Sequence, residues 1–162
     1  MGYYGCHLSS SGGNVAMVRT ALDIGADTFA FFTRNPRGSR AKNEDASDSA
    51  AAAVMLRECG FGPLVAHGSY TMNLCTADES ARAFAAQILH DDLRRMAALP
   101  GNYYNFHPGS HVGQGVDTGI AQIAEALRNA LIPGYPVTVL LETMAGKGSE
   151  IGGSFSQIYS YS

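Results

Sequence analysis

The sequence predicts an α/β fold built on a parallel sheet, and two features of the chain lead to that prediction. Five short apolar segments of strand-like composition alternate with four longer segments that have helical periodicity. Strands that alternate with helices in this way pair in parallel through right-handed crossovers. The 19 glycines, several of them next to proline, indicate tight connections between these elements.

Two strands and two helices are predicted in the first part of the chain. Residues 1–8 form a strand that ends near His7, and the apolar run Thr28–Phe32 forms a strand covered on both faces. Asn14 is expected to cap the first helix, and the alanine-rich residues 49–59 form the second. The apolar face of the first helix is expected at Val15, Val18 and Leu22.

Three further strands and two helices are predicted in the rest of the chain. The strands are Leu64–His67, Tyr103–Phe106 and Val137–Glu142. A long helix covers Glu79–Leu99, and apolar residues at i, i+3 and i+4 spacing predict another before Pro133. The apolar positions are Ala81, Phe84, Ala85, Ile88, Leu89 and Met96 in the first of these helices, and Ile120, Ile123, Ala124, Leu127, Ala130 and Leu131 in the second.

The composition describes one domain with a substantial core. Of 162 residues, 46% are hydrophobic and only 15% are charged, which excludes a disordered chain. A net charge of −3 provides no broad electrostatic attraction to nucleic acid, so any such binding is local. Three cysteines without a C-x-x-C pair, and the lack of a signal peptide or membrane-spanning run, predict a soluble cytoplasmic protein with reduced thiols.

Four of the five predicted strands end at a residue that can bind a metal. These residues are His7, His67, His107 and Glu142, and the last three are about one strand–helix unit apart. The carboxyl ends of parallel strands meet at one edge of a sheet, so we expect the side chains to converge there. Two imidazoles and a carboxylate suit Zn²⁺, and an open fourth position is typical of a catalytic zinc. The competing interpretation is a set of unrelated histidines that are hydrogen-bonded within the core.

Five segments of the sequence resemble the endonuclease IV family of zinc-dependent apurinic/apyrimidinic endonucleases, a group of xylose isomerase-like TIM barrels. Together they extend over most of the chain and occur in the family's order. The segments are G-C-H-L-S-S-S-G-G at 5–13, F-A-F-F-T-R-N-P-R at 29–37, H-G-S-Y-T-M-N-L at 67–74, N-F-H-P-G-S-H at 105–111 and L-E-T-M-A-G-K-G-S at 141–149.

The resemblance implies a fold, a cofactor and a reaction. Members of the family are (β/α)8 barrels with three Zn²⁺ ions, and they hydrolyse the phosphodiester 5′ to an abasic site in double-stranded DNA. By matching motifs, His67 and His107 resemble ligands of the first zinc. Glu142 resembles the glutamate that bridges the first two zincs, and we expect it to be a catalytic residue.

The same resemblance implies roles for side chains around the metal. Arg37 and Tyr70 resemble residues that enter the DNA at the lesion. His7 and His111 match motif positions that are not zinc ligands in the family, so a hydrogen-bonding role beside the ligands is expected for them.

The chain is shorter than the family's barrel, which typically needs about 250 residues and eight strands. We therefore expect an incomplete (β/α)8 TIM barrel of about five parallel strands and four helices. Residues 1–153 would form the partial barrel, and residues 154–162 would be an aberrant or truncated tail. Such a chain supplies a full protein ligand set for about one zinc, and we expect little or no nuclease activity from it alone. The family implies a monomer, although the open barrel edges favour self-association.

Two alternative functions stay open. A divalent-metal sugar isomerase or epimerase of the related barrel superfamily also gathers histidines and glutamates at strand ends. A non-catalytic half-barrel that self-associates is the other alternative. Arg37 and Tyr70, in their motifs, favour DNA over a sugar as the substrate.

Overall fold

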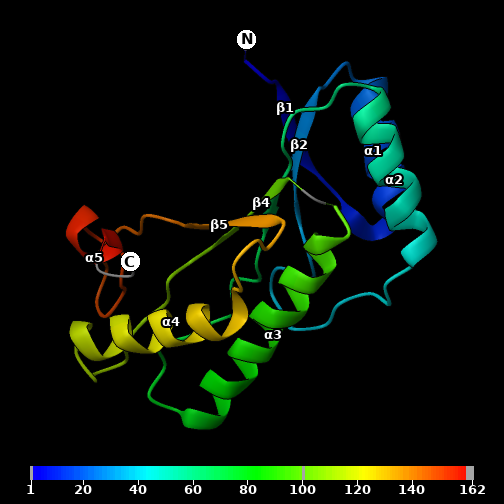
Figure 1. Cartoon of the computed structure of the whole chain (residues 1–162). Coiled ribbons are helices and arrows are strands. Elements are labelled where there is room, and N and C mark those ends of the chain that lie inside the picture. The colour runs from blue at the N-terminus through cyan, green and yellow to red at the C-terminus, as the bar shows by residue number, and fades with distance from the viewer. Residues whose placement is uncertain (1, 100, 160–162) are drawn as a thin grey trace.

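A parallel sheet forms the centre of the molecule in the computed structural model, which describes residues 2–99 and 101–159 (Figure 1). Five strands lie in sequence order, and each neighbouring pair is parallel, as the α/β prediction requires. This arrangement is a partial TIM barrel, as predicted. The strands are β1 (Gly5–Leu8), β2 (Thr28–Phe32), β3 (Val65–His67), β4 (Asn102–Phe106) and β5 (Val137–Leu141).

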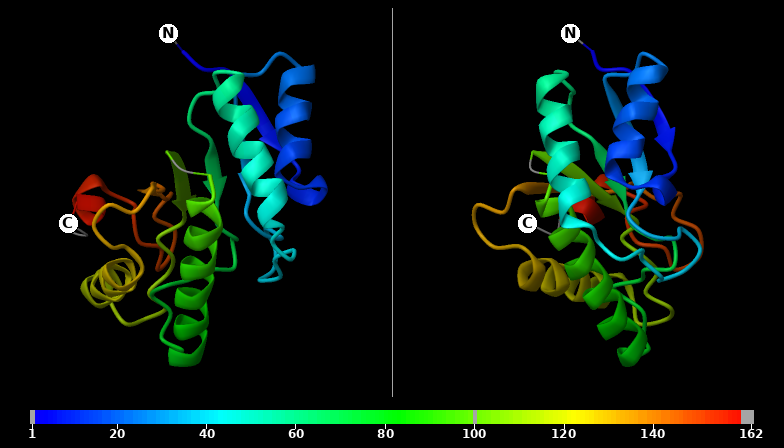
Figure 2. Two further views of the ribbon diagram at one scale, coloured as in Figure 1. Left: turned by 45° about the vertical axis from the view of Figure 1, so that its right-hand side comes forward. Right: turned by 90° about the vertical axis from the view of Figure 1, so that its right-hand side faces the viewer.

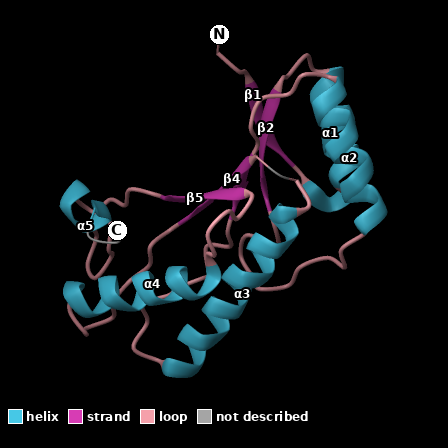
Figure 3. Cartoon of the chain, viewed as in Figure 1, coloured by secondary structure: helices cyan, strands magenta, loops and turns pink. Residues whose placement is uncertain are grey.

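Four helices connect the strands, as predicted, and a short fifth helix follows them (Figure 3). Their bounds are α1 (Asn14–Asp23), α2 (Ala46–Glu58), α3 (Glu79–Ala97), α4 (Val116–Ala130) and α5 (Phe155–Tyr159), and a 3-10 turn, η1 (Ser10–Gly12), precedes α1. The fifth helix, α5, lies in the segment expected to be an aberrant tail. Residues 160–162 of that segment, and Pro100 at the predicted helix stop, lie outside the described residues. Within the described ranges, we find no helix with the length and apolarity to cross a membrane.

The helices bury narrower faces than the sequence predicted. Leu22 in α1 is 41% exposed and Phe84 in α3 is 50% exposed, so both predictions of burial were wrong. At 100° per residue, Phe84 lies beyond the arc that α3 turns toward the core, and Leu22 lies in the last turn of α1. Ala81 is also exposed, because it lies in the first turn of α3, ahead of the part that packs. The residues that are buried are Met17, Val18 and Ala21 in α1, and Ala85, Ile88, Leu89, Asp92, Leu93 and Met96 in α3.

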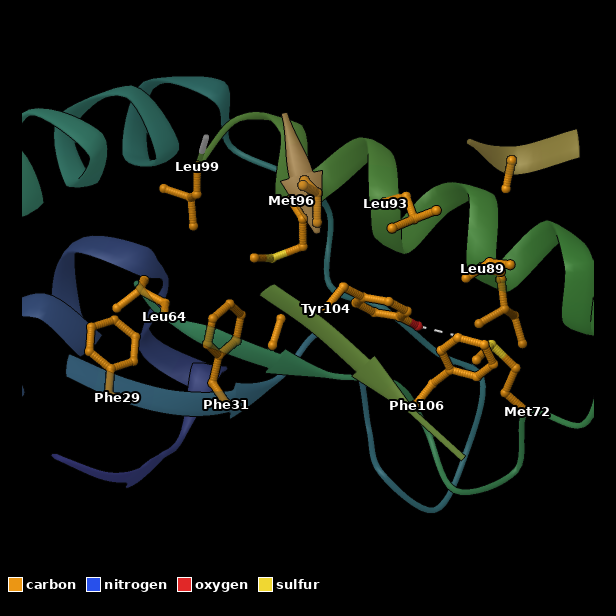
Figure 4. Close-up of a cluster of buried hydrophobic side chains, with 14 of the residues drawn as sticks. Phe29, Phe31, Leu64, Met72, Leu89, Leu93, Met96, Leu99, Tyr104 and Phe106 are labelled. Carbon is orange, nitrogen blue, oxygen red and sulfur yellow. Dashed lines mark hydrogen bonds between the residues drawn. The ribbon is translucent and has the colours of Figure 1, made fainter. Parts of the chain in front are cut away.

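The sheet is buried on one face only, which corrects the expectation that Thr28–Phe32 is covered on both faces. In β2, Phe29 and Phe31 are buried, whereas the alternate residues are half-buried. The same alternation occurs in β4, where Tyr104 and Phe106 are buried. Figure 4 shows these four side chains packed with leucines and methionines of α3 and the strand-end loops.

The opposite face of the sheet is lined by residues that the register places in rows. Phe32, His67, Asn105 and Leu140 are successive partners in one row, and all are half-buried or exposed. In a complete barrel this face would be covered by side chains from the strands across the lumen. The metal-binding side chains therefore come from the face that the helices do not cover.

An aspartate from α2 fixes the start of α1, and the two helices lie side by side (Figure 2). The N-cap position of α1 is Gly13, which makes no side-chain cap, so the predicted capping by Asn14 was wrong. Instead, Asp48 accepts hydrogen bonds from the backbone N–H groups of Asn14 (2.6 Å) and Val15 (3.2 Å). The carboxylate thus satisfies two N–H groups that have no partner inside the helix.

We expect Asp48→Ala to lower the free energy of unfolding by about 1–2 kcal/mol, because it removes this cap from α1. Asp117→Ala is the matched control, since Asp117 is exposed in the first turn of α4. Urea denaturation followed by circular dichroism would measure both. Equal losses in the two variants would contradict a capping role for Asp48.

Candidate metal centre

Three neighbouring strands bring together the side chains of His67, His107 and Glu142. His67 is the last residue of β3, and the other two directly follow β4 and β5. The Nε2 atom of His67 lies 2.9 Å from Oε2 of Glu142, and Nε2 of His107 lies 3.6 Å from Oε1 of the same carboxylate. One ligand atom from each residue lies within 4.8 Å of the others. The structure therefore brings together the three residues that the sequence predicted as metal ligands.

The hydrogen bonds of His67 favour a cation at this position. Its Nδ1 lies 2.7 Å from the backbone carbonyl oxygen of Gly68, which can only accept, so Nδ1 carries a proton. In the neutral tautomer, Nε2 is then an unprotonated acceptor that faces the carboxylate of Glu142. Two facing acceptors need a positive charge, which either a second ring proton or a bound metal supplies. A carbonyl that holds Nδ1–H is also the usual support for a metal-binding histidine.

Asn105 is a site residue that the sequence analysis missed. Its Nδ2 donates to Oε2 of Glu142 at 2.5 Å. Asn105 lies two residues before His107, and alternate residues of a strand share a face, so the spacing contained the signal. With Oε2 engaged by Asn105 and His67, Oε1 is the carboxylate oxygen that faces His107.

Glu142 is held in its charged form by this environment. Partial burial opposes the charge, but hydrogen bonds with His67 and Asn105, together with the nearby imidazoles, outweigh burial and lower the pKa of Glu142. The carboxylate is therefore ionised at neutral pH, as a metal ligand must be.

Tyr70 covers one side of the two histidines. Its ring centre lies 5.6 Å from that of His67 and 5.3 Å from that of His107, and its residue surface is 54% exposed. The ring of Phe32 packs against both Tyr70 and His67, with distances between ring centres of 5.1 Å and 5.2 Å. An exposed aromatic ring directly beside the candidate metal ligands can contact a substrate that reaches the metal.

The turn that carries Arg37 lies directly against the loop that carries Tyr70. The backbone N–H of Tyr70 donates to the carbonyl of Pro36 at 2.9 Å, and the Ser69 hydroxyl donates to the carbonyl of Gly38 at 2.9 Å. Arg37 is exposed, and its N–H donates to the side-chain oxygen of Asn35. The two residues predicted to contact DNA are therefore brought to one place.

His7 and His111 lie apart from the three candidate ligands. The ring of His7 packs on Phe32 at 4.7 Å, and Phe32 separates it from His67. His111 braces its own loop, because its Nδ1 accepts from Gly115 N–H and its N–H donates to the carbonyl of Ser149. Among the described residues, neither histidine is hydrogen-bonded to His67, His107 or Glu142. Their expected role beside the metal therefore remains a prediction.

A comparison of the sequence with models of known protein families identifies the family of this chain. A family model described as "Xylose isomerase-like TIM barrel" matches residues 18–161. The chain belongs to the xylose isomerase-like TIM barrel family. The match agrees with the order and parallel pairing of the strands.

Within this family the chain is similar to proteins named "Probable endonuclease 4". It is 57% identical over 158 residues to the "Probable endonuclease 4" of Akkermansia muciniphila, covering 98% of this chain and 57% of that protein. It is 53% identical to the protein of the same name from Alkaliphilus oremlandii, covering 95% of this chain and 55% of the relative. The chain thus spans just over half the length of these relatives. The resemblance to endonuclease IV is confirmed.

Comparison with solved structures gives the same result for the fold. Endonuclease IV from Thermus thermophilus matches with a TM-score of 0.82 and 32% identity, covering 99% of this chain and 58% of that one. A D-psicose 3-epimerase matches with a TM-score of 0.58 at 13% identity, covering 99% and 70% of the two chains. At that identity the epimerase shares the fold alone.

Three arginines, one from the turn that carries Arg37 and two from α3, surround Asp91 of α3. Asp91 receives hydrogen bonds from Arg34 (2.9 Å), Arg94 (2.9 Å) and Arg95 (2.8 Å). Burial opposes the charge on Asp91, but these three guanidinium groups outweigh it and lower its pKa to about 2.

We expect Asn105→Ala to weaken the binding of Zn²⁺ about 10- to 100-fold, because Glu142 loses the donor that orients it. Thr138→Ala is the control, since Thr138 is exposed on the same face of the sheet in β5. Calorimetric titration with Zn²⁺ measures both affinities. An unchanged affinity in Asn105→Ala would mean that Glu142 is oriented without Asn105.

We also expect a pH-dependent contribution of Asp91 to stability. Its folded pKa, about 2, is below the ordinary value of 3.8, so its contribution is present above the ordinary value and is lost as pH falls toward the lowered one. The difference in unfolding free energy between the natural chain and Asp91→Asn should therefore be largest near neutral pH and shrink under acid. Urea denaturation at a series of pH values measures it, with the exposed Glu125→Gln as control. A difference that grows as pH falls would contradict the ion-pair assignment.

Proposed function

We propose that this chain forms the metal-binding and lesion-recognising part of an endonuclease that hydrolyses the phosphodiester 5′ to abasic sites in double-stranded DNA. The observation that carries the proposal is the convergence of His67, His107 and Glu142 beside the exposed Tyr70. The similarity to proteins named endonuclease 4, at 57% and 53% identity, supports it.

The donor set fits Zn²⁺. Two imidazole nitrogens and one carboxylate leave a fourth tetrahedral position open, as catalytic zinc sites do. The unprotonated Nε2 that a neutral His67 directs at Glu142 also fits a bound cation. Zinc bound here would supply a water nucleophile at neutral pH and would neutralise charge on the phosphate.

The residues of the chain would prepare the site and the substrate for that chemistry. Asn105 would hold Glu142 with one oxygen directed toward His107, so that the carboxylate serves as ligand and catalytic group. Tyr70 and Arg37 would enter the duplex where a base is missing, a place where little stacking has to be disrupted. His7 and His111 would not bind the zinc and would have a hydrogen-bonding role around the site.

Recognition of DNA by this chain would be local. The net charge of −3 does not attract DNA over the whole surface. Arg40, which is exposed on the same turn as Arg37, would contact a phosphate next to the lesion. We therefore propose that affinity depends on the abasic site more than on DNA length.

The proposal covers one metal and a low intrinsic rate. Among residues 2–99 and 101–159, one group of three metal-binding side chains lies within ligand distance, and a three-zinc site needs more ligands. We propose that residues 1–153 act as one unit that holds one Zn²⁺. We also propose that the exposed edges β1 and β5 allow self-association in its isolated form.

We expect the purified chain to bind about one Zn²⁺ and to prefer an abasic duplex over an intact one by about tenfold, because one three-ligand set and one lesion-reading turn are present. Zinc is measured by elemental analysis after dialysis, and DNA binding by fluorescence anisotropy. His107→Ala should lose the zinc, whereas His90→Ala, which removes an exposed histidine of α3, should keep it.

The same preparation tests the reaction. Incision of the abasic duplex should be slow, should occur 5′ to the lesion, and should stop when a chelator removes the metal. Rapid incision would overturn the proposal of a single metal. Absence of any preference for the abasic duplex would overturn the proposed function.

A further inference from the structure

A buried ion pair connects the turn that carries Arg37 to helix α3. Arg34 is only 8% exposed although it lies in a loop, and Asp92 of α3 is fully buried. The guanidinium donates from Nε to Oδ1 of Asp92 at 2.9 Å and from Nη2 to the same oxygen at 2.5 Å. The Tyr104 hydroxyl donates to the other oxygen, Oδ2, at 2.8 Å. Both oxygens of the buried carboxylate are therefore engaged.

The remaining arm of Arg34 closes the turn itself. Its Nη1 donates to the backbone carbonyl of Ser39 at 2.7 Å. The backbone N–H of Asn35 donates to the carbonyl of Arg40, and that of Gly38 donates to the carbonyl of Asn35. One side chain thus joins the start of the 34–40 turn, its far end and α3.

Stability alone gives a weak reason for this arrangement. Burying an arginine and an aspartate carries a large desolvation cost, and replacing such a pair by apolar side chains of similar volume is often neutral or stabilising. The planar guanidinium fixes the geometry of the turn, because its rigid set of N–H donors sets the angle of every hydrogen bond that it makes. Burial opposes ionisation of Arg34, but its bonds and charge contacts with Asp92 and Asp91 raise its pKa, so it stays charged.

The same turn is hydrogen-bonded to the loop that carries Tyr70, which lies beside the candidate metal centre. Pro36 and Gly38 accept hydrogen bonds from Tyr70 N–H and the Ser69 hydroxyl, both at 2.9 Å. Ser69 is itself buried, at 3% exposed. Arg37 therefore lies in a turn that is held by hydrogen bonds from two places, the side chain of Arg34 and the loop of Tyr70.

We propose that Arg34 and Asp92 are positioning residues, which fix the 34–40 turn so that Arg37 is presented to DNA beside Tyr70. They act through the turn and do not touch the substrate. The consequence for DNA rests on the proposed function, whereas the consequence for the turn does not. Loss of the pair should release the turn and leave the metal ligands unchanged.

The test uses the double variant Arg34→Met/Asp92→Leu, which removes both charges together and leaves no unpaired ion. We expect trypsin to cleave after Arg37 about tenfold faster, because the turn opens more often, with unchanged cleavage after Arg128 in α4. The preference for an abasic over an intact duplex should fall about tenfold, because Arg37 is no longer pre-positioned. Zinc affinity should be unchanged.

Two further variants separate positioning from folding and from charge. Tyr104→Phe removes only the hydroxyl that holds Asp92, so it serves if the double variant does not fold, and it should show a smaller change of the same kind. Arg94→Gln removes a positive charge beside Asp91. Because Arg94 donates to Asp91 and Glu44 and not to the 34–40 turn, this variant should leave cleavage and DNA preference unchanged.

A conservative variant tests the fork of the guanidinium. Arg34→Lys keeps the positive charge beside Asp92 but loses the planar set of donors that holds the turn. We expect this variant to fold and to show a reduced preference for the abasic duplex. If Arg34→Lys prefers the abasic duplex as strongly as the unsubstituted chain does, the positive charge alone positions Arg37 and the planar set of donors is not needed.

The outcomes distinguish this proposal from the proposed function. A folded double variant, or a folded Tyr104→Phe variant, with the natural rate of cleavage after Arg37 overturns the positioning role. If the natural chain shows no preference for abasic DNA, the proposed function fails. Faster cleavage in the variant would then still support the positioning of the turn, and unchanged cleavage would still overturn it.

Discussion

The parallel register of β3, β4 and β5 is the constraint on which the candidate metal centre depends. His67 pairs with Asn105, and Phe106 pairs with Leu141, so His107 and Glu142 follow the sheet side by side. The ladder continues past the strand ends, where Gly68 N–H donates to the carbonyl of Asn105 and Glu142 N–H to that of Phe106. A shift of one residue would turn these side chains to the helix-covered face, so main-chain hydrogen bonds determine the position of every ligand.

One face of the sheet packs into the core, and the other presents residues of the candidate metal centre. One face carries aromatic and aliphatic residues such as Phe31, Tyr104 and Phe106 into the core beneath the helices. The other face carries Asn105 and His67, and it stays half-buried in this chain. Because alternate residues point to opposite faces, each strand contributes to the core and to the site at once. Substitutions on the second face can therefore change chemistry without removing core contacts.

Polar contacts between loops fix the segments that follow the strands. Asn73 joins the Tyr70 loop to the loop after β4, because its side chain donates to the carbonyl of Ser110 and accepts from the N–H groups of Ser110 and Cys75. A side chain on Gly109 would overlap the Asn73 oxygen, and the φ of Gly109, +113°, also favours glycine. Loops built in this way have defined shapes, which a site for both a metal and a nucleic acid requires.

The sequence by itself determined the alternation of strands and helices, the parallel pairing and the three side chains at the candidate metal centre. Those features follow from local composition and from the rule that parallel strands share one carboxyl edge. Only the tertiary structure decided that Asp48 caps α1, that Leu22 and Phe84 are exposed, and that Arg34 pairs with Asp92. Each of these depends on which element lies beside which, and contacts between residues far apart in sequence leave no local pattern from which they can be predicted.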